Sequence, residues 1–160
     1  MRKTGGLTAL AAWAILLTAA ASPASGAAPA SHAATAREIF EASGVRGGLV
    51  VHVGCGDGRL TADLRPSDSY VVQGLDTDEK DVAAAREHLL SLASYGKVSV
   101  RRFDGRHLPY ADNLVNLLVV SCPSPVERGE MLRVLRPGGV AVTLAADGTL
   151  ANGRVFADAA

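Results

Sequence analysis

The stretch LVVHVGCGDGRL, residues 49–60, decides the fold of this 160-residue chain. It begins with a continuous apolar run rich in β-branched residues, which is typical of a strand covered on both faces. Three glycines follow at alternate positions, Gly54, Gly56 and Gly58, and a helical pattern comes next. A strand that turns through glycines into a helix predicts a βα unit of a parallel sheet, with a ligand-binding loop at the turn.

Extended and helical patterns alternate through the rest of the chain. Helices are expected over residues 35–44, 57–64, 77–96 and 126–135, and strands over 48–53, 69–76, 97–103, 114–121 and 139–145. This alternation predicts a parallel sheet between layers of helices. Right-handed crossovers favour the doubly wound, Rossmann-like α/β fold with strand order 3-2-1-4-5, which binds ligands beyond the carboxyl ends of its strands. Thr35, three residues before Glu38, is expected to cap the first helix.

The first 26 residues have the layout of a secretory signal peptide. Arg2 and Lys3 precede an apolar run over residues 7–21, and small residues follow near Gly26. The run is shorter than the roughly 20 residues that span a bilayer, so no stable membrane span is expected after cleavage. Residues 27–36 are expected to form a linker and residues 37–160 one domain. We therefore expect an exported protein, periplasmic or secreted; a mis-assigned start would make it cytoplasmic.

The charge balance limits the classes of partner. The chain has 16 basic and 16 acidic residues and a formal net charge of zero. Nucleic-acid binding needs an excess or a cluster of Lys and Arg, and the short basic stretches RRFDGRH and RVLR are interrupted by other residues. No nucleic-acid partner is expected. The two cysteines have no suitably spaced histidines, so no metal site is expected.

The glycine spacing separates two kinds of ligand. Dinucleotide binding requires G-x-G-x-x-G, and Arg59 stands where the third glycine should be. The spacing G-x-G-x-G suits a ligand that presents an amino acid and a ribose, with no pyrophosphate to bind. Two acids follow at the ends of later strands: Asp76, placed 22 residues after Gly54 to accept ribose hydroxyls, and Asp104. All three segments are expected to face one crevice.

Together these motifs resemble the class I S-adenosylmethionine-dependent methyltransferases, specifically their type 11-like domain. The resemblance covers about residues 47–144 and rests on four ordered segments: VVHVGCGDGRL, GLDTDEKDVAAAREHL, VRRFDGRHLPYADNLVNLLVVS and EMLRVLRPGGVAVTL. It implies S-adenosylmethionine as cofactor and methylation of a small molecule. A similar domain precedes a pyrroloquinoline-quinone-binding-like β-propeller in some exported bacterial proteins, so fusion to or association with another domain is a further expectation.

The resemblance implies a set of cofactor-binding residues. Gly54 and Gly56 would contact the methionine part, Asp76 the ribose, and Asp104 and Gly105 the adenine. The full expected set is His52, Gly54, Cys55, Gly56, Asp76, Thr77, Asp104, Gly105 and Ser121. Purely structural interpretations stay open: Gly54 as a tight turn, Asp76 as a helix cap and Asp104 as a turn acid.

The chain departs from the family at two functional positions. His52 stands where the family carries Asp or Glu, and a neutral imidazole supplies no permanent negative charge. The other interpretation of His52 is a hydrogen-bonded histidine inside a strand. SCPSP, residues 121–125, follows strand four in place of the Asn or Asp and two prolines of amino-directed methyltransferases. No catalytic residue is therefore assigned, and an exported, non-catalytic binding or scaffold module is the alternative function.

The C-terminus and the cysteines carry two more expectations. Strands six and seven of the family are expected to be missing, which makes the domain C-terminally incomplete. Residues 146–156 suffice only for a short hairpin through Asp147-Gly148. Cys55 and Cys122 follow neighbouring strands, so a disulfide is one hypothesis in an oxidising compartment. Two unrelated small apolar side chains are the other.

Overall fold

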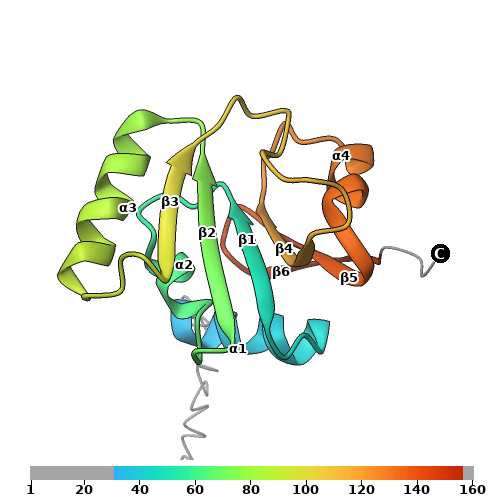
Figure 1. Ribbon diagram of the computed structural model, residues 1–160, viewed down its shortest axis with the longest axis horizontal. Coiled ribbons are helices and arrows are strands. Elements are labelled where there is room, and N and C mark those ends of the chain that lie inside the picture. The colour runs from blue at the N-terminus through green and yellow to red at the C-terminus, as the bar shows by residue number, and fades with distance from the viewer. Residues whose placement is uncertain (1–30, 157–160) are drawn as a thin grey trace, which may run out of the picture.

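The computed structural model describes residues 31–156, which form one mixed sheet with helices on both faces (Figure 1). The elements in chain order are α1 (His32–Ser43), β1 (Gly48–Val53), α2 (Arg59–Asp63), β2 (Tyr70–Asp76), α3 (Glu79–Ser91), β3 (Val98–Arg102), β4 (Val115–Ser121), α4 (Arg128–Val134), β5 (Leu135–Leu144) and β6 (Leu150–Phe156). The strand order is β3-β2-β1-β4-β5-β6. The predicted order 3-2-1-4-5 is confirmed.

Strand β1 lies at the centre because its apolar run is buried on both sides. It pairs in parallel with β2 and β4, so that Val51 lies between Gln73 and Leu118. Val50 faces the core that α1, α2 and α3 cover. Val51 faces a second core, which α4 and the segment before β4 cover. This two-sided burial is why every residue of the run 49–53 except His52 is apolar.

Helix α1 begins earlier than its sequence pattern predicts. Ser31 is the N-cap, and its hydroxyl accepts a hydrogen bond from the Ala34 amide at 3.3 Å. Thr35 lies inside the helix and is buried, so its predicted capping role is wrong. The last five residues of the expected linker are therefore helical. Gly44 ends the helix in the left-handed conformation, as predicted, with its amide donating to the Phe40 carbonyl at 2.9 Å.

The hairpin after β5 forms and adds a strand to the sheet. The Gly148 amide donates to the Ala145 carbonyl at 2.9 Å, and the Ala145 amide donates to the Thr149 carbonyl at 2.8 Å. Strand β6 runs antiparallel to β5. The short hairpin predicted through Asp147-Gly148 is therefore confirmed, and the expectation that strand six is missing is wrong, because a hairpin needs only a short local turn. Residues 31–156 contain no seventh strand.

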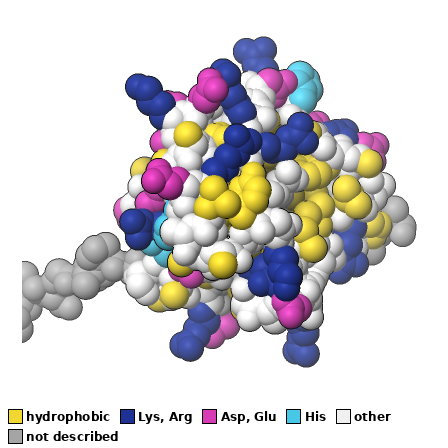
Figure 2. Space-filling view, turned by 60° about the vertical axis from the view of Figure 1, so that its left-hand side comes forward, with side chains coloured by type: hydrophobic (Ala, Val, Ile, Leu, Met, Phe, Trp, Pro, Cys, Tyr) yellow, Lys and Arg dark blue, Asp and Glu magenta, His cyan; other side chains and the backbone are white. Residues whose placement is uncertain are grey.

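The surface of the domain carries both apolar and charged side chains. Large hydrophobic side chains stay exposed at Val71, Leu90, Leu92, Tyr95 and Leu114, and Figure 2 shows apolar side chains among basic and acidic ones on one face. None of the helices within residues 31–156 has the length and apolar character needed to cross a membrane. The expected signal peptide, residues 1–26, lies outside the described residues.

Candidate functional site

The loop after β1 takes a shape that needs its glycines. Gly54, Gly56 and Gly58 have φ values of 74°, 50° and 77°, all in the left-handed region that favours glycine. The Gly54 amide donates to the Leu75 carbonyl of β2 at 2.8 Å. A Cβ atom on Gly54 would lie 3.2 Å from Cβ of Ser121, at the end of β4. The loop is thus held between the carboxyl ends of β2 and β4.

Gly58 has a packing role that the sequence did not reveal. A Cβ atom there would lie 2.8 Å from Cβ and 3.0 Å from Cα of Ala85 in α3. In the dinucleotide pattern the third glycine has a different role, which is to let the helix pack closely on the sheet. Gly58 instead lets the loop after β1 approach α3, and the glycine spacing by itself does not indicate this neighbour.

Asp76 connects the end of β2 to the glycine loop. Its Oδ2 atom accepts from the Gly56 amide at 2.9 Å, and its Oδ1 atom accepts from the amides of Thr77 at 2.7 Å and Asp78 at 3.1 Å. A carboxylate offers about four lone-pair positions, so about one remains, on Oδ2. Asp78 caps α3 by accepting from the Lys80 amide at 2.8 Å. The interpretation of Asp76 as the helix cap is therefore wrong.

His52 is enclosed and bonded at both ring nitrogens. Nδ1 lies 2.8 Å from Thr61 Oγ1 in α2, and Nε2 lies 3.0 Å from Ser121 Oγ. Burial lowers the pKa of His52 from 6.5 to about 4, although the charge of Asp76 acts in the opposite direction. The imidazole is neutral near pH 7, and its two hydrogen bonds connect β1 to α2 and to β4. Thr61 was not expected at the site; its only signal was a hydroxyl on the apolar face of a short helix.

A cavity of about 450 Å³ lies beyond the ends of β1, β4 and β5. Four of the expected cofactor-binding residues line it: His52, Gly54, Cys55 and Ser121. The start of α1 and the turn between β5 and β6 supply further walls. Sequence reasoning assigned neither segment to the site, because each lies far along the chain from the glycine loop.

The two cysteines do not form a disulfide. Both are free; Cys55 is buried and Cys122 is exposed. Cys55 packs against Gly74 of β2, where a Cβ atom would lie 3.1 Å from Sγ. Burial is the main cause that raises the pKa of the Cys55 thiol to about 12. The disulfide hypothesis is therefore wrong.

Residues 31–156 also hold no cluster of three His, Cys, Asp or Glu side chains suited to a metal ion.

Asp104 organises the turn after β3. Its Oδ1 atom accepts from the amides of Arg106 at 2.8 Å and His107 at 2.7 Å, and Oδ2 lies 2.8 Å from Nδ1 of His107. The two backbone bonds are the largest cause that lowers the pKa of Asp104 to about 2. Asp104 is thus a turn acid, yet about half of its side chain stays exposed. Gly105 is buried, and a Cβ atom there would lie 3.0 Å from Cγ2 of Thr77.

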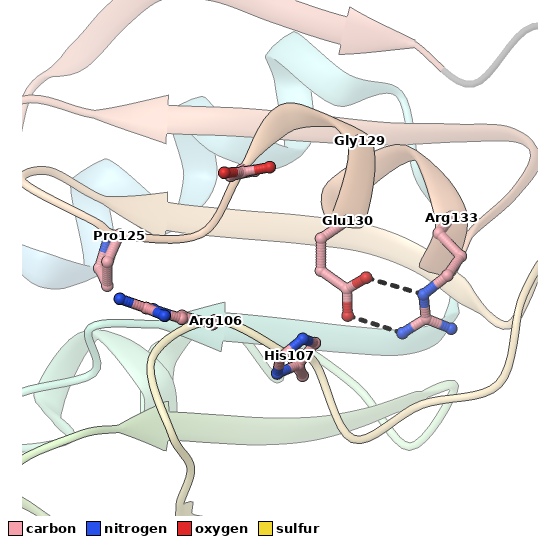
Figure 3. A pocket seen from close by; sticks show the side chains of 7 residues that line it. Arg106, His107, Pro125, Gly129, Glu130 and Arg133 are labelled. Atoms are coloured by element: carbon pink, nitrogen blue, oxygen red, sulfur yellow. Dashed lines mark hydrogen bonds and ion pairs between the residues drawn. The ribbon is translucent and has the colours of Figure 1, made fainter.

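A second cavity, of about 800 Å³, lies between this turn and α4 (Figure 3). Arg133 forms one wall and pairs with Glu130 through two hydrogen bonds, at 2.8 and 2.7 Å. Its other donors bond to Asp112 and to the carbonyls of Leu108 and Tyr110. All five N–H donors of the guanidinium are therefore used. Arg133 holds the segment before β4 against α4 and has no donor left for a ligand.

Known proteins are similar to this chain in sequence or in fold. The profile described as "Methyltransferase domain" matches residues 50–139. The chain is 33% identical over 110 residues to the methyltransferase GfsG of Streptomyces halstedii, covering 64% of this chain and 39% of that protein. It is 31% identical over 107 residues to the demethylmenaquinone methyltransferase of Desulfitobacterium hafniense, covering 61% and 42%. The chain thus spans about two fifths of the length of these relatives.

Solved structures agree on the fold. A putative S-adenosyl-L-methionine-dependent methyltransferase of Methanococcus maripaludis matches with a TM-score of 0.63 and 20% identity, over 71% of this chain and 54% of that one. The geranyl diphosphate C-methyltransferase of Streptomyces coelicolor matches with a TM-score of 0.64 and 20% identity, over 70% and 45%. Because the family profile covers more than half of the chain, this protein belongs to the methyltransferase domain family.

Proposed function

We propose that this protein binds S-adenosylmethionine across the carboxyl ends of β1, β2 and β3 and methylates a small molecule. The observation that carries the proposal is the contact between the Gly56 amide and Asp76 Oδ2. It brings the glycine loop and the acid of β2 together at the carboxyl edge of the sheet, next to the switch point between β1 and β4 where this class of fold binds ligands. Family membership supports the same conclusion.

The residues present fit the cofactor. A Cβ atom on Gly56 would meet no atom within 4 Å, so the backbone there is open to a ligand. The remaining lone pair of Asp76 can accept one ribose hydroxyl, fewer than the two expected from the sequence. The exposed part of Asp104 can accept from an adenine amino group. His52 and Ser121 lie at the methionine end, where the neutral imidazole orients the serine hydroxyl.

In this proposal the residues of the chain position the methyl acceptor against the cofactor and supply no strong base for proton transfer. The cofactor supplies an electrophilic methyl group on a sulfonium ion. His52 is a poor base, since its pKa is about 4 and both ring nitrogens are bonded. Cys55 is equally unsuited, because burial keeps its thiol protonated. Holding the acceptor in line with the methyl group lowers the barrier without a base, so we assign no catalytic residue.

The acceptor is proposed to be a small molecule. The cavity of about 450 Å³ next to Ser121 has the size of a small-molecule site. One relative is named for demethylmenaquinone, and one matched structure contains geranyl diphosphate. Both are small molecules, and they support this class of acceptor without naming the individual substrate.

Calorimetry with S-adenosylhomocysteine tests the proposal. Asp76→Asn keeps the side-chain shape but replaces one acceptor oxygen with a donor, so we expect at least about a tenfold weaker Kd. Asp63→Asn, at an exposed aspartate in α2, is the matched control and should bind like the wild type. A folded wild-type protein that gives no heat at millimolar ligand would refute the proposal.

We also propose that the chain is exported, on the basis of the charge and apolar pattern of residues 1–26. Fusing residues 1–30 to a reporter that is active only outside the cytoplasm tests this. An inactive fusion, beside an active control with a known export signal, would contradict it.

A further inference from the structure

The adenine end of the proposed cofactor site is covered by the protein itself. Gly105 is buried. A Cβ atom on it would lie 3.0 Å from Cγ2 of Thr77 and 3.2 Å from Cγ of Pro125. The two side chains come from different segments, the end of β2 and the segment between β4 and α4. Both side chains lie next to the glycine that the cofactor's base would have to reach.

The gap between these two side chains is too narrow for an aromatic ring. Since both atoms are measured from one point, Thr77 Cγ2 and Pro125 Cγ lie at most about 6 Å apart, the sum of the two distances. A ring between two apolar groups needs carbon–carbon separations of about 3.5 Å on each face, or roughly 7 Å in all. An adenine over Gly105 therefore requires one of the two side chains to move.

Pro125 is the side chain that can move. The backbone of Thr77 is held on both sides, because its amide donates to Asp76 Oδ1 at 2.7 Å and its carbonyl accepts from Arg102 Nε at 3.1 Å. Pro125 is exposed. Among the described residues, the segment 122–126 makes no hydrogen bond to the Asp104 turn. Displacing the proline ring therefore breaks a contact with Gly105 but no hydrogen bond to that turn.

The segment around Pro125 is anchored at its two ends. The Cys122 amide donates to the Leu144 carbonyl of β5 at 2.9 Å. Val126 is 5% exposed and packs in the core on the α4 side. Between these anchors, the Ser124 hydroxyl bonds only within the segment, accepting from the Val126 amide at 3.3 Å. A short stretch held at both ends and loosely in the middle can swing without unfolding its neighbours.

We infer that residues 122–126 form a strap that closes over the adenine end of the site, and that Pro125 must swing away from Gly105 before the cofactor binds. The inference rests on the proposed function. Because only the open fraction binds, the observed Kd exceeds the intrinsic Kd by the inverse of that fraction. Weakening the closed contact should therefore tighten binding and speed association.

Binding of S-adenosylhomocysteine to Pro125→Ala tests the strap. The substitution removes the Cγ atom that lies over Gly105, so we expect a faster association rate constant and a Kd lowered several-fold. Pro66→Ala, at another exposed proline, is the matched control and should leave both unchanged. An unchanged or weaker Kd in Pro125→Ala would overturn the inference while leaving the proposed function intact.

Hydrogen exchange without ligand tests the strap even if no variant binds the cofactor. The Gly105 amide should exchange at least about tenfold faster in Pro125→Ala than in the wild type and in Pro66→Ala, because the proline ring next to this buried glycine is gone. Equal rates would overturn the inference. Failure to bind in every variant, together with faster exchange, would refute the proposed function and keep the strap.

Discussion

Gly58→Ala is expected to destabilise the domain through two separable effects. The residue has a φ of 77°, and placing an L-residue there costs about 1–2 kcal/mol. The new methyl group would also lie 2.8 Å from Cβ of Ala85, and overpacking of this kind costs about 1–3 kcal/mol. The total of about 2–5 kcal/mol is below the 5–15 kcal/mol stability of an average domain. The variant should therefore still fold.

The partner substitution Ala85→Gly separates the two effects. Alone it should cost about 1–2 kcal/mol, from helix propensity and the lost burial of one methyl group. In the double variant the contact between the two Cβ atoms disappears, whereas the 3.0 Å approach to Cα of residue 85 and the backbone cost of Gly58→Ala stay. Urea unfolding followed by circular dichroism should then show a favourable coupling energy of about 1 kcal/mol or more. Single effects that add within about 0.5 kcal/mol would refute the claim that Gly58 is needed for this approach to α3.

Three further predictions concern other parts of the site. Arg133→Lys should lower the free energy of unfolding by about 2 kcal/mol, because an ammonium cannot replace five directed donors; Arg128→Lys, at an exposed arginine of the same helix, should have little effect in the same urea titration. His52 has a pKa of about 4 when folded and near 6.5 when unfolded, so protons favour the unfolded state and stability should fall by up to about 3 kcal/mol as pH drops from 6.5 towards 4. His52→Gln should lack this part of the decline, and parallel pH curves for the two proteins would contradict the burial of a neutral imidazole. A thiol reagent at pH 8 should label Cys122 in the native protein and Cys55 only after unfolding, since Cys55 is buried with a raised pKa; two fast phases would contradict this.

The sequence was sufficient for the order of the strands and for the place of the site. The run before Gly54 is apolar at every position but one, which only a strand buried on both faces requires. Alternating strands and helices with right-handed crossovers leave few topologies. Asp76 ends β2 and Asp104 lies two residues beyond the end of β3, so their placement at the carboxyl edge of the sheet followed from chain order alone.

The ends of the elements were less predictable, because local signals competed. Thr35 and Glu38 have the spacing of a capping box, but Ser31 caps the helix and Thr35 is buried. Burial of α1 against the sheet decides which turn begins the helix, and sequence spacing carries no information on that packing. The short strand β6 likewise depends on the free edge of β5 beside it.

What each side chain does was decided by tertiary contacts. In the sequence, His52 departs from the motif of the family. In the structure its two ring nitrogens bond to Thr61, 9 residues away, and to Ser121, 69 residues away. Asp76 reads as a free ribose acceptor, but backbone amides already use about three of its four acceptor positions. Residue type and spacing do not determine side-chain rotamers or which distant segments come into contact. Both are set only when the helices pack on the sheet. The sequence by itself thus determined the family and the edge of the sheet at which we propose that the cofactor binds, and only the packed structure decided which atoms at that edge remain free to bind it.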